Sequence, residues 1–419
     1  MKEPLILKPE DLYPTVELEG KRVRFERTIA ACKKYFGKTS GKHLRLFSVP
    51  GRTEISGNHT DHNCGKVLAA SVSLDIIAVV EPLSENKIII KSEGFDENAV
   101  SLDNLKPVPE EKGSSEALIR GVAAGFEKAG FNIGGFKAYT ASDVLLGSGM
   151  SSSAAFEVMI GTILSSLYNE GKVEPSRIAK IAQKAENDYF GKPSGLLDQM
   201  ACASGGFIAI DFMDAGSPII GKVNVSIDAF GHDLCIINTG TNHAGMTDEY
   251  AAIPGEMHEI ASFFGADCLR KISRKDIVLN INFLRETYGD RAVLRALHFF
   301  EENDRVDKLI HALEHSDFEH FLHYIKQSGD SSFKYLQNIY STGDIKHQPI
   351  AVALNAAEYA LEGKGACRVH GGGFAGTVQA FVPHEMLKVF KFSLERIFGI
   401  NSCYALSVRE HGCTEVLLD

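Results

Sequence analysis

The sequence predicts an α+β protein built from two domains. Its 419 residues are enough for two or three domains, and two domains suit an enzyme whose active site lies in a cleft. Hydrophobic residues make up 44% of the chain and charged residues 23%, so packed cores are easily supplied. Near the C-terminus, over residues 365–408, strands alternate with glycine turns and a helix. This order predicts a sheet with helices on it.

The composition argues against several classes of protein. Lysine and arginine total 44 against 54 aspartate and glutamate residues, a net charge of −10, and an acidic chain is a poor partner for nucleic acid. An anionic small molecule is not excluded, because backbone amides and a metal ion attract it locally. The chain has no signal-peptide pattern, no apolar run near the ~18 residues that span a membrane, and no CxxC pair among its eight cysteines. We expect a soluble, cytoplasmic protein without a zinc cage, a disulfide framework or a membrane partner.

Apolar periodicity predicts the secondary structure of the N-terminal half. Residues 1–40 carry apolar residues among charges and predict an amphipathic helix. The remaining elements expected here are strands at Leu44–Val49, Val67–Val80 and Lys87–Lys91, an irregular connection at 101–113, a helix at 114–129 and a strand-like segment at Thr140–Leu146.

The C-terminal half is expected to be mainly helical. A strand at Asp233–Asn238 is followed by a helix that starts within 243–253, and 255–340 is almost wholly helical in pattern. The histidines of this region lie among charged residues without an H-E-x-x-H pair, which predicts surface histidines and not metal ligands; they are His311, His315, His320 and His323. The chain is expected to close with a helix at His384–Ile397 and a strand at Cys403–Val408.

The stretch ASDVLLGSGMSSSAAFE (141–157) is read as a strand, a glycine–serine loop and the start of a helix. Gly147 and Gly149 lack the Cβ atoms that would keep backbone N–H groups from converging on a ligand. The three serines at 151–153 stand where a helix begins, and there unpaired N–H groups and the helix dipole favour an anion. A serine N-cap after flexible glycines has the same pattern, so a phosphate site and a plain helix start both fit. The stretch is neither a Walker A loop nor a GxGxxG dinucleotide motif.

Two further segments are rich in chemistry-bearing residues. A polar loop after Pro50-Gly51 carries seven hydrogen-bonding side chains, namely Arg52, Glu54, Asn58, His59, Asp61, His62 and Asn63. Such a loop is either a solvated connection between strands or a site for a ligand rich in hydroxyls. In KAENDYFGKPSGLLDQMACASGG (184–206), Glu186 falls near a helix end and Asp198 lies among apolar residues after a turn. Asp198 is either a helix cap, a common role for Asp, or a catalytic carboxylate.

Together these segments resemble the galactokinase branch of the GHMP small-molecule kinases. The chain reads GRTEISGNHTDHN where the family pattern is roughly GRVNLIGEHTDYN, and LLGSGMSSSA where the family has PxGxGLSSSA, with Leu145 replacing the proline. The other matching segments are the Gly-x-x-Asp-Gln sequence at Gly195–Gln199, Tyr250 in a TDEY tetrad, and the glycine-rich HGGGFAG at 370–376. The motifs occur along the full length in the family's order.

The resemblance implies a two-domain fold, with an N-terminal α/β domain containing a left-handed βαβ crossover and a ferredoxin-like C-terminal domain. We place these domains at residues 1–230 and 231–419, with the active site between them. The implied activity is phosphorylation of galactose by ATP at the anomeric hydroxyl. The implied partners are the sugar and ATP, with no nucleic acid or membrane, in a monomer or weak homo-oligomer.

The resemblance also implies roles for individual residues. The ATP phosphates would be held by Gly147, Ser148, Gly149, Met150, Ser151, Ser152 and Ser153. Mg²⁺ would be held by Glu186 and by Ser152 or Ser153, hard oxygen ligands of the kind it prefers, and Ser92 would touch the nucleotide. Asp198 would accept or orient the proton of the sugar hydroxyl, and Arg52 would neutralise charge on the transferring group. The sugar would be held by Asn58, His59, Thr60, Asp61, Gly195 and Tyr250.

Asn58 departs from the family pattern, which has Glu in that position. An amide forms weaker hydrogen bonds to a hydroxyl than a carboxylate does, so a weaker or more tolerant galactose site is expected. Two other functions stay open: a GHMP kinase for another sugar such as N-acetylgalactosamine, and a non-catalytic sensor of galactose and ATP. The complete Ser-Ser-Ser-Ala sequence at 151–154 favours an enzyme over a sensor.

Overall fold

Two β-sheets organise the protein in the computed structural model, which describes residues 6–37, 44–144, 150–192, 194–214, 216–240, 247–374 and 376–418. The larger sheet has nine strands, and seven of them follow the order β1-β13-β2-β3-β6-β4-β5, while β7 and β8 extend from β3. The strand bounds are β1 Ile6–Leu7, β2 Arg45–Ser56, β3 Lys66–Pro82, β4 Lys87–Ser92, β5 Glu97–Ser101, β6 Phe136–Ser142, β7 Phe207–Asp211, β8 Ile219–Val223 and β13 Thr414–Val416. The predicted strands at 67–80 and 87–91 are confirmed.

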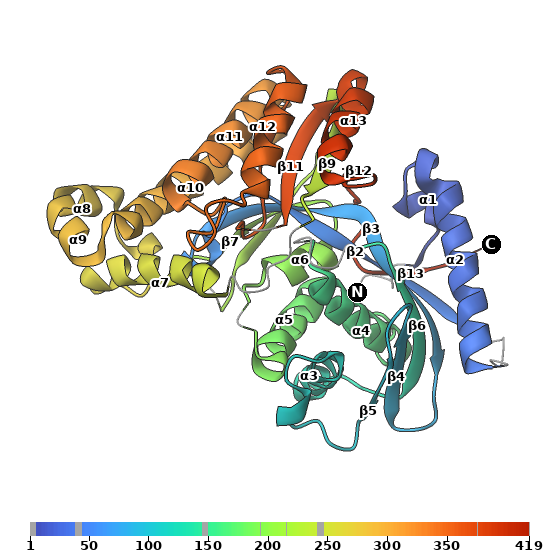
Figure 1. Ribbon diagram of the computed structural model, residues 1–419. Coiled ribbons are helices and arrows are strands. Elements are labelled where there is room, and N and C mark those ends of the chain that lie inside the picture. Colours follow the sequence, from blue (N-terminus) through green and yellow to red (C-terminus); the bar gives the residue numbers. More distant parts are fainter. Residues whose placement is uncertain are drawn as a thin grey trace.

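Helices cover both faces of the larger sheet (Figure 1). On one face lie α3 Ser115–Lys128, α4 Ser152–Tyr168, α5 Pro175–Ala185 and α6 Leu197–Ser204. On the other face lies α2 Thr15–Phe36, after the short α1 Pro9–Leu12. Side chains alternate between the faces of a strand, so Leu46 of β2 packs with α2 while its neighbour Phe47 packs with the four-helix side. A strand covered on both faces is expected to be continuously apolar, as β3 largely is.

The long strand β2 replaces the polar loop that the sequence predicted after Pro50. Arg52 and Glu54 lie on β2 and pair with β3, and the register shifts twice, between Pro50 and Arg52 and between Glu54 and Ser56. A β-bulge accommodates a proline and turns the strand locally. The expected loop is therefore wrong for 51–56, and the bulges set the directions of the side chains there.

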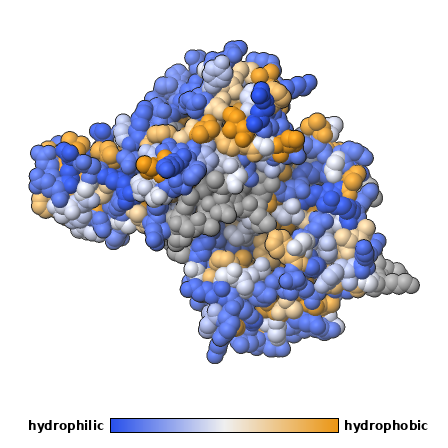
Figure 2. All heavy atoms as spheres, in the orientation of Figure 1, coloured by the Kyte–Doolittle hydropathy of each residue, from blue (hydrophilic) through white to orange (hydrophobic). Residues whose placement is uncertain are grey.

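The helical region forms an arm that extends from the body of the protein (Figure 1). Its helices are α7 Thr247–Phe263, α8 Arg274–Leu279, α9 Ile281–Tyr288, α10 Asp290–Glu314 and α11 Phe318–Ser331. The arm has an apolar core of its own, which includes Met257, Leu284 and Phe299. Figure 2 shows that the surface on this side of the molecule is mostly hydrophilic, with apolar side chains in small groups.

The smaller sheet has the order β10-β11-β9-β12 and is antiparallel throughout. Its strands are β9 His232–Asn238, β10 Ala366–His370, β11 Thr377–Pro383 and β12 Cys403–Leu406, and α12 Pro349–Leu361 and α13 Leu387–Phe398 pack on it. This arrangement confirms the predicted sheet with helices on it at residues 365–408.

Several strands, β13 among them, were not expected from the sequence. The last strand, β13, pairs with β1 and β2 in the larger sheet, so the chain returns to its N-terminal part after completing the smaller sheet. The main apolar core also runs across the two sheets, joining Ile236 and Phe381 to Phe47 and Phe207. The division into residues 1–230 and 231–419 stays a prediction. Within the described residues, no helix has the length and apolar character needed to cross a membrane.

Candidate active site

Arg52 and Asp198 form the centre of the site. Arg52 donates from Nε to Oδ1 of Asp198 at 2.7 Å, and its Nη2 lies 2.6 Å from the same oxygen. The hydroxyl of Ser151 donates to Oδ2. Asp198 stands in the first turn of α6, whose N-cap is Leu196, and no side chain caps that helix. The carboxylate therefore contacts Arg52 and Ser151, and the interpretation of Asp198 as a helix cap is wrong.

The electrostatics of this pair keep both groups charged. Burial acts to raise the pKa of Asp198, but the charge and hydrogen bonds of Arg52, the hydrogen bond from Ser151 and the charge of Lys192 together outweigh it, so the pKa of Asp198 is lowered. Asp198 in turn raises the pKa of Arg52 against the effect of burial. Asp198 is thus an ionised hydrogen-bond acceptor at neutral pH, held in place by a cation and a hydroxyl.

Helix α4 begins beside Asp198. Ser151, its N-cap, has left-handed backbone angles of φ 56° and ψ 56°, a conformation that costs energy for any residue except glycine and recurs at functional sites. Just before it, the carbonyl of Met150 accepts a hydrogen bond from the backbone N–H of Arg52 at 3.5 Å. The end of the predicted phosphate loop is therefore tied to β2. Gly147, Ser148 and Gly149 lie outside the described residues.

Glu186 is a buried carboxylate with four hydrogen-bond donors around it. It is 2% exposed and begins a π-helical turn, Glu186–Phe190, directly after α5, a local structure frequent at functional sites. The donors are Ser153 Oγ at 3.2 Å, Lys192 Nζ at 2.9 Å, Ser194 Oγ at 2.5 Å and Gln199 Nε2 at 2.9 Å. Of the two serines considered as metal ligands, Ser153 is the one that bonds to Glu186, and Ser152 does so nowhere in the described part of the chain.

The oxygen atoms of Glu186 and Ser153 are suitable ligands for a hard cation. Carboxylate and hydroxyl oxygens are the ligands that Mg²⁺ prefers, and it completes its shell with water and phosphate oxygens. The Lys192 ammonium already bonds to Oε1 of Glu186, so the carboxylate accepts a cation there. In the described ranges, no group of three or more His, Cys, Asp or Glu side chains forms an all-protein metal site.

The residues predicted to hold a sugar are either buried or partly buried. A Cβ on Gly195 would lie 2.4 Å from Oδ2 of Asp61, so glycine lets this carboxylate approach the backbone next to Asp198. Thr60 is fully buried and donates to the carbonyls of Gly57 and Lys66 at 2.8 and 2.6 Å, which gives it a role in holding the turn.

His59 presents a free nitrogen. Its Nε2 lies 3.0 Å from the carbonyl oxygen of Gly372, and a carbonyl only accepts, so Nε2 carries the proton. The other nitrogen, Nδ1, is buried and has no hydrogen-bond partner among the described residues. Burial and the neighbouring His62 lower the pKa of His59 to about 4, so Nδ1 is an unprotonated acceptor at neutral pH.

Asn58 lies beneath the surface of the site. It is 0% exposed, and its Nδ2 donates to Glu54 Oε1 at 2.9 Å and to the Gly371 carbonyl at 2.7 Å. Its Oδ1 accepts from Asn338 Nδ2 at 2.8 Å. Every polar atom of this side chain is thus bonded within the protein, and a direct contact between Asn58 and a sugar stays a prediction.

The glycine-rich segment 370–376 faces these residues. Tyr250 donates to the carbonyl of Gly373 at 2.6 Å, and a Cβ on Gly372 would lie 2.3 Å from the Tyr250 ring. The segment therefore approaches both Tyr250 and His59 through its backbone. Ser92 is placed differently, at the end of β4, where its hydroxyl accepts from Thr140 at 2.8 Å, and none of its described contacts is with the residues above.

Comparisons with known proteins find two matching family models. Residues 117–206 match the model of the GHMP kinases N terminal domain, and residues 33–82 match the galactokinase galactose-binding signature. The chain therefore contains these two segments in the order that the sequence predicted. The first of these segments contains Ser151, Glu186 and Asp198, and the second contains Arg52 and Asp61.

Curated relatives and solved structures agree with these matches. The chain is 29% identical to the galactokinase of Glaesserella parasuis over 82% of this chain and 86% of the relative. It is also 29% identical to the galactokinase of Thermotoga petrophila, over 79% of this chain and 87% of that relative. The fold is similar to that of Lactococcus lactis galactokinase complexed with galactose, with a TM-score of 0.79 and 24% identity. The match covers 93% of this chain and 99% of that structure. It is also similar to a mevalonate kinase structure, with a TM-score of 0.63, 16% identity, and coverage of 87% and 99%. The predicted two-domain GHMP fold is confirmed.

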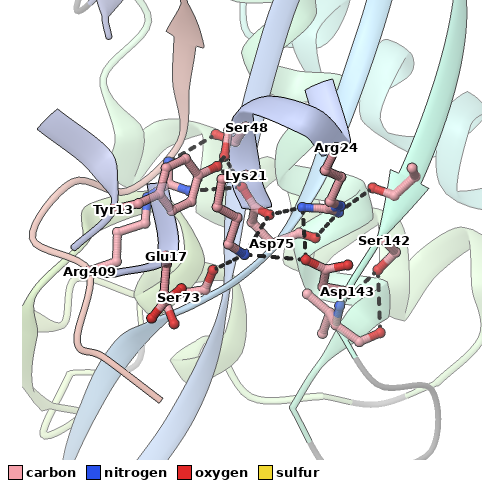
Figure 3. Close-up of polar contacts among 12 residues, drawn as sticks. Tyr13, Glu17, Lys21, Arg24, Ser48, Ser73, Asp75, Ser142, Asp143 and Arg409 are labelled. Atoms are coloured by element: carbon pink, nitrogen blue, oxygen red, sulfur yellow. Dashed lines mark hydrogen bonds and ion pairs between the residues drawn. The ribbon is translucent and has the colours of Figure 1, made fainter. Parts of the chain in front are cut away.

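A buried charge cluster lies beside the start of the predicted phosphate loop (Figure 3). Asp75 of β3 is fully buried and bonds to Arg24 and Arg409. Arg24 Nη1 and Lys21 Nζ, both from α2, also reach Oδ2 of Asp143 at 3.1 and 3.2 Å. The Asp143 N–H donates to the Asp75 carbonyl at 3.0 Å. Helix α2 therefore fixes the chain two residues before position 145.

Sequence reasoning missed several residues that support the candidate site. His298 of α10 donates from Nε2 to the Asn58 carbonyl at 3.0 Å. Glu302, one turn later, accepts from Ser56 Oγ at 2.7 Å and from the Gly57 N–H at 2.9 Å. These residues lie more than 200 positions from the segments that they hold, inside a helical pattern with no local signal. Only the packing of the arm against β2 brings them there.

Proposed function

We propose that this protein is a galactokinase, which transfers the γ-phosphoryl group of ATP to the anomeric hydroxyl of galactose and yields galactose 1-phosphate. The observation that carries the proposal is the ionised Asp198, held between Arg52 and Ser151 at the start of α4. Phosphoryl transfer depends mainly on positioning and on charge stabilisation. A carboxylate, a buried guanidinium and a helix N-terminus in contact supply both.

In this proposal the nucleotide lies at the N-terminus of α4. The first N–H groups of a helix have no partner within the helix, and they and the dipole favour phosphate. Residues 147–153 contribute this anion site, with Ser92 as a further nucleotide contact. Glu186 and Ser153, 3.2 Å apart, are the pair that would hold Mg²⁺, which neutralises phosphate charge when bound.

Asp198 and Arg52 then act on the reacting groups. The Asp198 carboxylate accepts a hydrogen bond from the attacking sugar hydroxyl and orients it. Because the pKa of Asp198 is lowered, it is a weak base, so it takes the proton late, as the new phosphorus–oxygen bond forms. Arg52 stabilises negative charge on the transferring group from the other side of the same carboxylate.

The sugar site is built from the segment 58–61 together with Gly195 and Tyr250. The lone pair on His59 Nδ1 and the carboxylate of Asp61 are two acceptors for sugar hydroxyls. Thr60 and Asn58 hold the turn that carries them, Gly195 leaves room beside Asp61, and Tyr250 supports the glycine-rich segment from the other side. The galactokinase galactose-binding signature at residues 33–82 and the galactokinase relatives favour galactose among the possible sugars.

The test is an ADP-release assay of the purified chain with Mg²⁺·ATP and a panel of aldohexoses and N-acetylated sugars. We expect turnover with galactose and formation of the 1-phosphate, identified by phosphorus NMR. Turnover confined to N-acetylgalactosamine would support a kinase for another sugar. Binding of galactose and ATP without turnover would support the sensor function.

A further inference from the structure

A second buried carboxylate lies behind Glu186. Glu157 of α4 is 0% exposed, and its Oε2 accepts a hydrogen bond from Gln199 Nε2 at 3.1 Å. The same nitrogen donates to Glu186 Oε2 at 2.9 Å. The amide of Gln199, the residue directly after Asp198, therefore joins the two carboxyl groups with its two N–H bonds.

Two oxygens of this group remain without partners. Oε1 of Glu157 and Oε1 of Gln199 are both buried and have no hydrogen-bond partner in the described part of the chain. A buried polar atom without a partner destabilises the folded state, so two such oxygens on one hydrogen-bonded pair of side chains require an explanation. If Glu157 were ionised, both oxygens would be acceptors and neither could satisfy the other.

A proton on Glu157 satisfies both oxygens at once. A carboxylic acid and a primary amide form a pair with two hydrogen bonds, one from the amide nitrogen to the acid and one from the acid hydroxyl to the amide oxygen. The first of these bonds is the one observed between Gln199 and Glu157. Burial and the neighbouring charge of Glu186 also raise the pKa of Glu157 well above its ordinary value, in keeping with a neutral acid.

We propose that Glu157 is a neutral carboxylic acid that holds the Gln199 amide in a two-bond pair, and thereby fixes Glu186 for the metal ion. Glu157 touches neither substrate nor metal, so it is a positioning residue. The role in metal binding rests on the proposed function, whereas the protonated pair does not. In the pair the amide cannot rotate, so Nε2 stays directed at Glu186 Oε2.

Two substitutions separate a neutral acid from a carboxylate. Glu157→Gln retains the size and both bonds of the acid, because its NH₂ donates to Gln199 and its oxygen accepts. Glu157→Leu removes both bonds and frees the Gln199 amide. Loss of a group that orients a metal ligand typically costs about 10–100-fold in metal affinity. Thr162→Val is the control, because Thr162 is buried on the same helix and bonds to the Val158 carbonyl.

The readouts are the affinity for Mn²⁺, measured by electron paramagnetic resonance with ADP present, and the infrared difference spectrum between the parent and Glu157→Gln. We expect unchanged Mn²⁺ affinity in Glu157→Gln and Thr162→Val, and roughly 10–100-fold weaker affinity in Glu157→Leu. We also expect the parent alone to show the carbonyl stretch of a protonated acid, without any substrate.

Three outcomes would overturn the proposal. Equal losses of Mn²⁺ affinity in Glu157→Gln and Glu157→Leu would show an ionised carboxylate. An unchanged affinity in Glu157→Leu would remove the positioning role. Absence of the acid carbonyl band would exclude the protonated pair even if Glu157→Leu does not fold. Because the band is recorded on the protein alone, it decides the protonation whether or not the chain phosphorylates galactose.

Discussion

The amide of Asn58 donates to the carboxylate of Glu54 at 2.9 Å, and the two residues lie four positions apart around the end of β2. In the family pattern GRVNLIGEHTDYN these two positions are held in reverse, by Asn at the position of Glu54 and by Glu at the position of Asn58. The chain therefore has the same two side-chain types with their positions exchanged. Arg368, fully buried, donates to the same Glu54 oxygen at 3.1 Å, which fixes the charge at position 54.

We expect the single substitution Asn58→Glu to destabilise the protein. It would place a second carboxylate oxygen against Glu54 and the Gly371 carbonyl, two acceptors that now receive the Asn58 amide, and an uncompensated buried charge costs about 3–5 kcal/mol. The double variant Glu54→Asn/Asn58→Glu restores one amide and one carboxylate and should recover most of the loss. Urea unfolding and the KM for galactose of the three proteins provide the measurement. Equal stability in the single and double variants would contradict the pairing.

Asp198→Ala should abolish most turnover while ATP binding is retained. The carboxylate orients the sugar hydroxyl and receives its proton, and such a group contributes about 10²–10⁴-fold to the rate. The comparison needs kcat from the coupled assay and the Kd for ATP from calorimetry. A rate within about tenfold of the parent, below the range for such a group, would remove Asp198 from the reaction.

Glu186→Ala should raise the Mg²⁺ concentration needed for half-maximal activity and weaken binding of Mg²⁺·ATP. Galactose binding without nucleotide should stay intact, because Glu186 bonds to Ser153, Lys192, Ser194 and Gln199 and to none of the predicted sugar residues. Titration of activity against Mg²⁺ at fixed ATP gives the result. An unchanged Mg²⁺ dependence would place the metal ligand elsewhere.

The protein should lose stability as the pH falls below about 6.5, the ordinary pKa of histidine. Burial lowers the pKa of His59 to about 4, and it also lowers the pKa values of His298 and His370. The unfolded chain then binds protons that the folded chain refuses, so the stabilisation is complete above about 6.5 and is lost as the pH falls toward 4. Each such proton contributes up to about 1.4 kcal/mol per pH unit.

Urea unfolding at several pH values measures this slope. His59→Gln should make it shallower, whereas the same substitution at the exposed His258, whose ring bonds to the neutral Ser262 hydroxyl, should leave it unchanged. A slope that is the same in His59→Gln and the parent would mean that His59 takes up its proton equally in both states.

Asp143→Asn should raise the KM for ATP more than the KM for galactose. Asp143 receives Lys21 and Arg24 of α2 at 3.2 and 3.1 Å and stands two residues before position 145, so loss of its charge loosens the approach to the phosphate loop and not the sugar segment. The control is Arg27→Gln. Arg27 lies on the same helix α2, and its substitution breaks only the exposed ion pair with Glu93. Equal changes in the two KM values would argue against this anchoring role.

The amino-acid sequence was enough to predict the family resemblance, the order of the motifs and much of the secondary structure. The family resemblance located Arg52, Glu186 and Asp198, because each lies in a short segment that matches the family pattern. Periodicity found the strands at 67–80 and 87–91 and the helical arm, because apolar residues recur there at strand or helix spacing.

The contacts among these residues could not be predicted from the sequence and follow from the three-dimensional fold. Asp198 is a partner of Arg52 and not a helix cap. Strand β2 continues through its bulges, so Arg52 reaches Asp198 although the two residues lie 146 positions apart in the sequence. Asn58 is buried, because Asn338 and the segment 370–376 close over it. The Glu157–Gln199–Glu186 contact depends on how α4, α5 and α6 pack together. A local pattern records the preference of each segment, but a contact between distant segments follows from the burial of all of them at once, which no single stretch of sequence encodes.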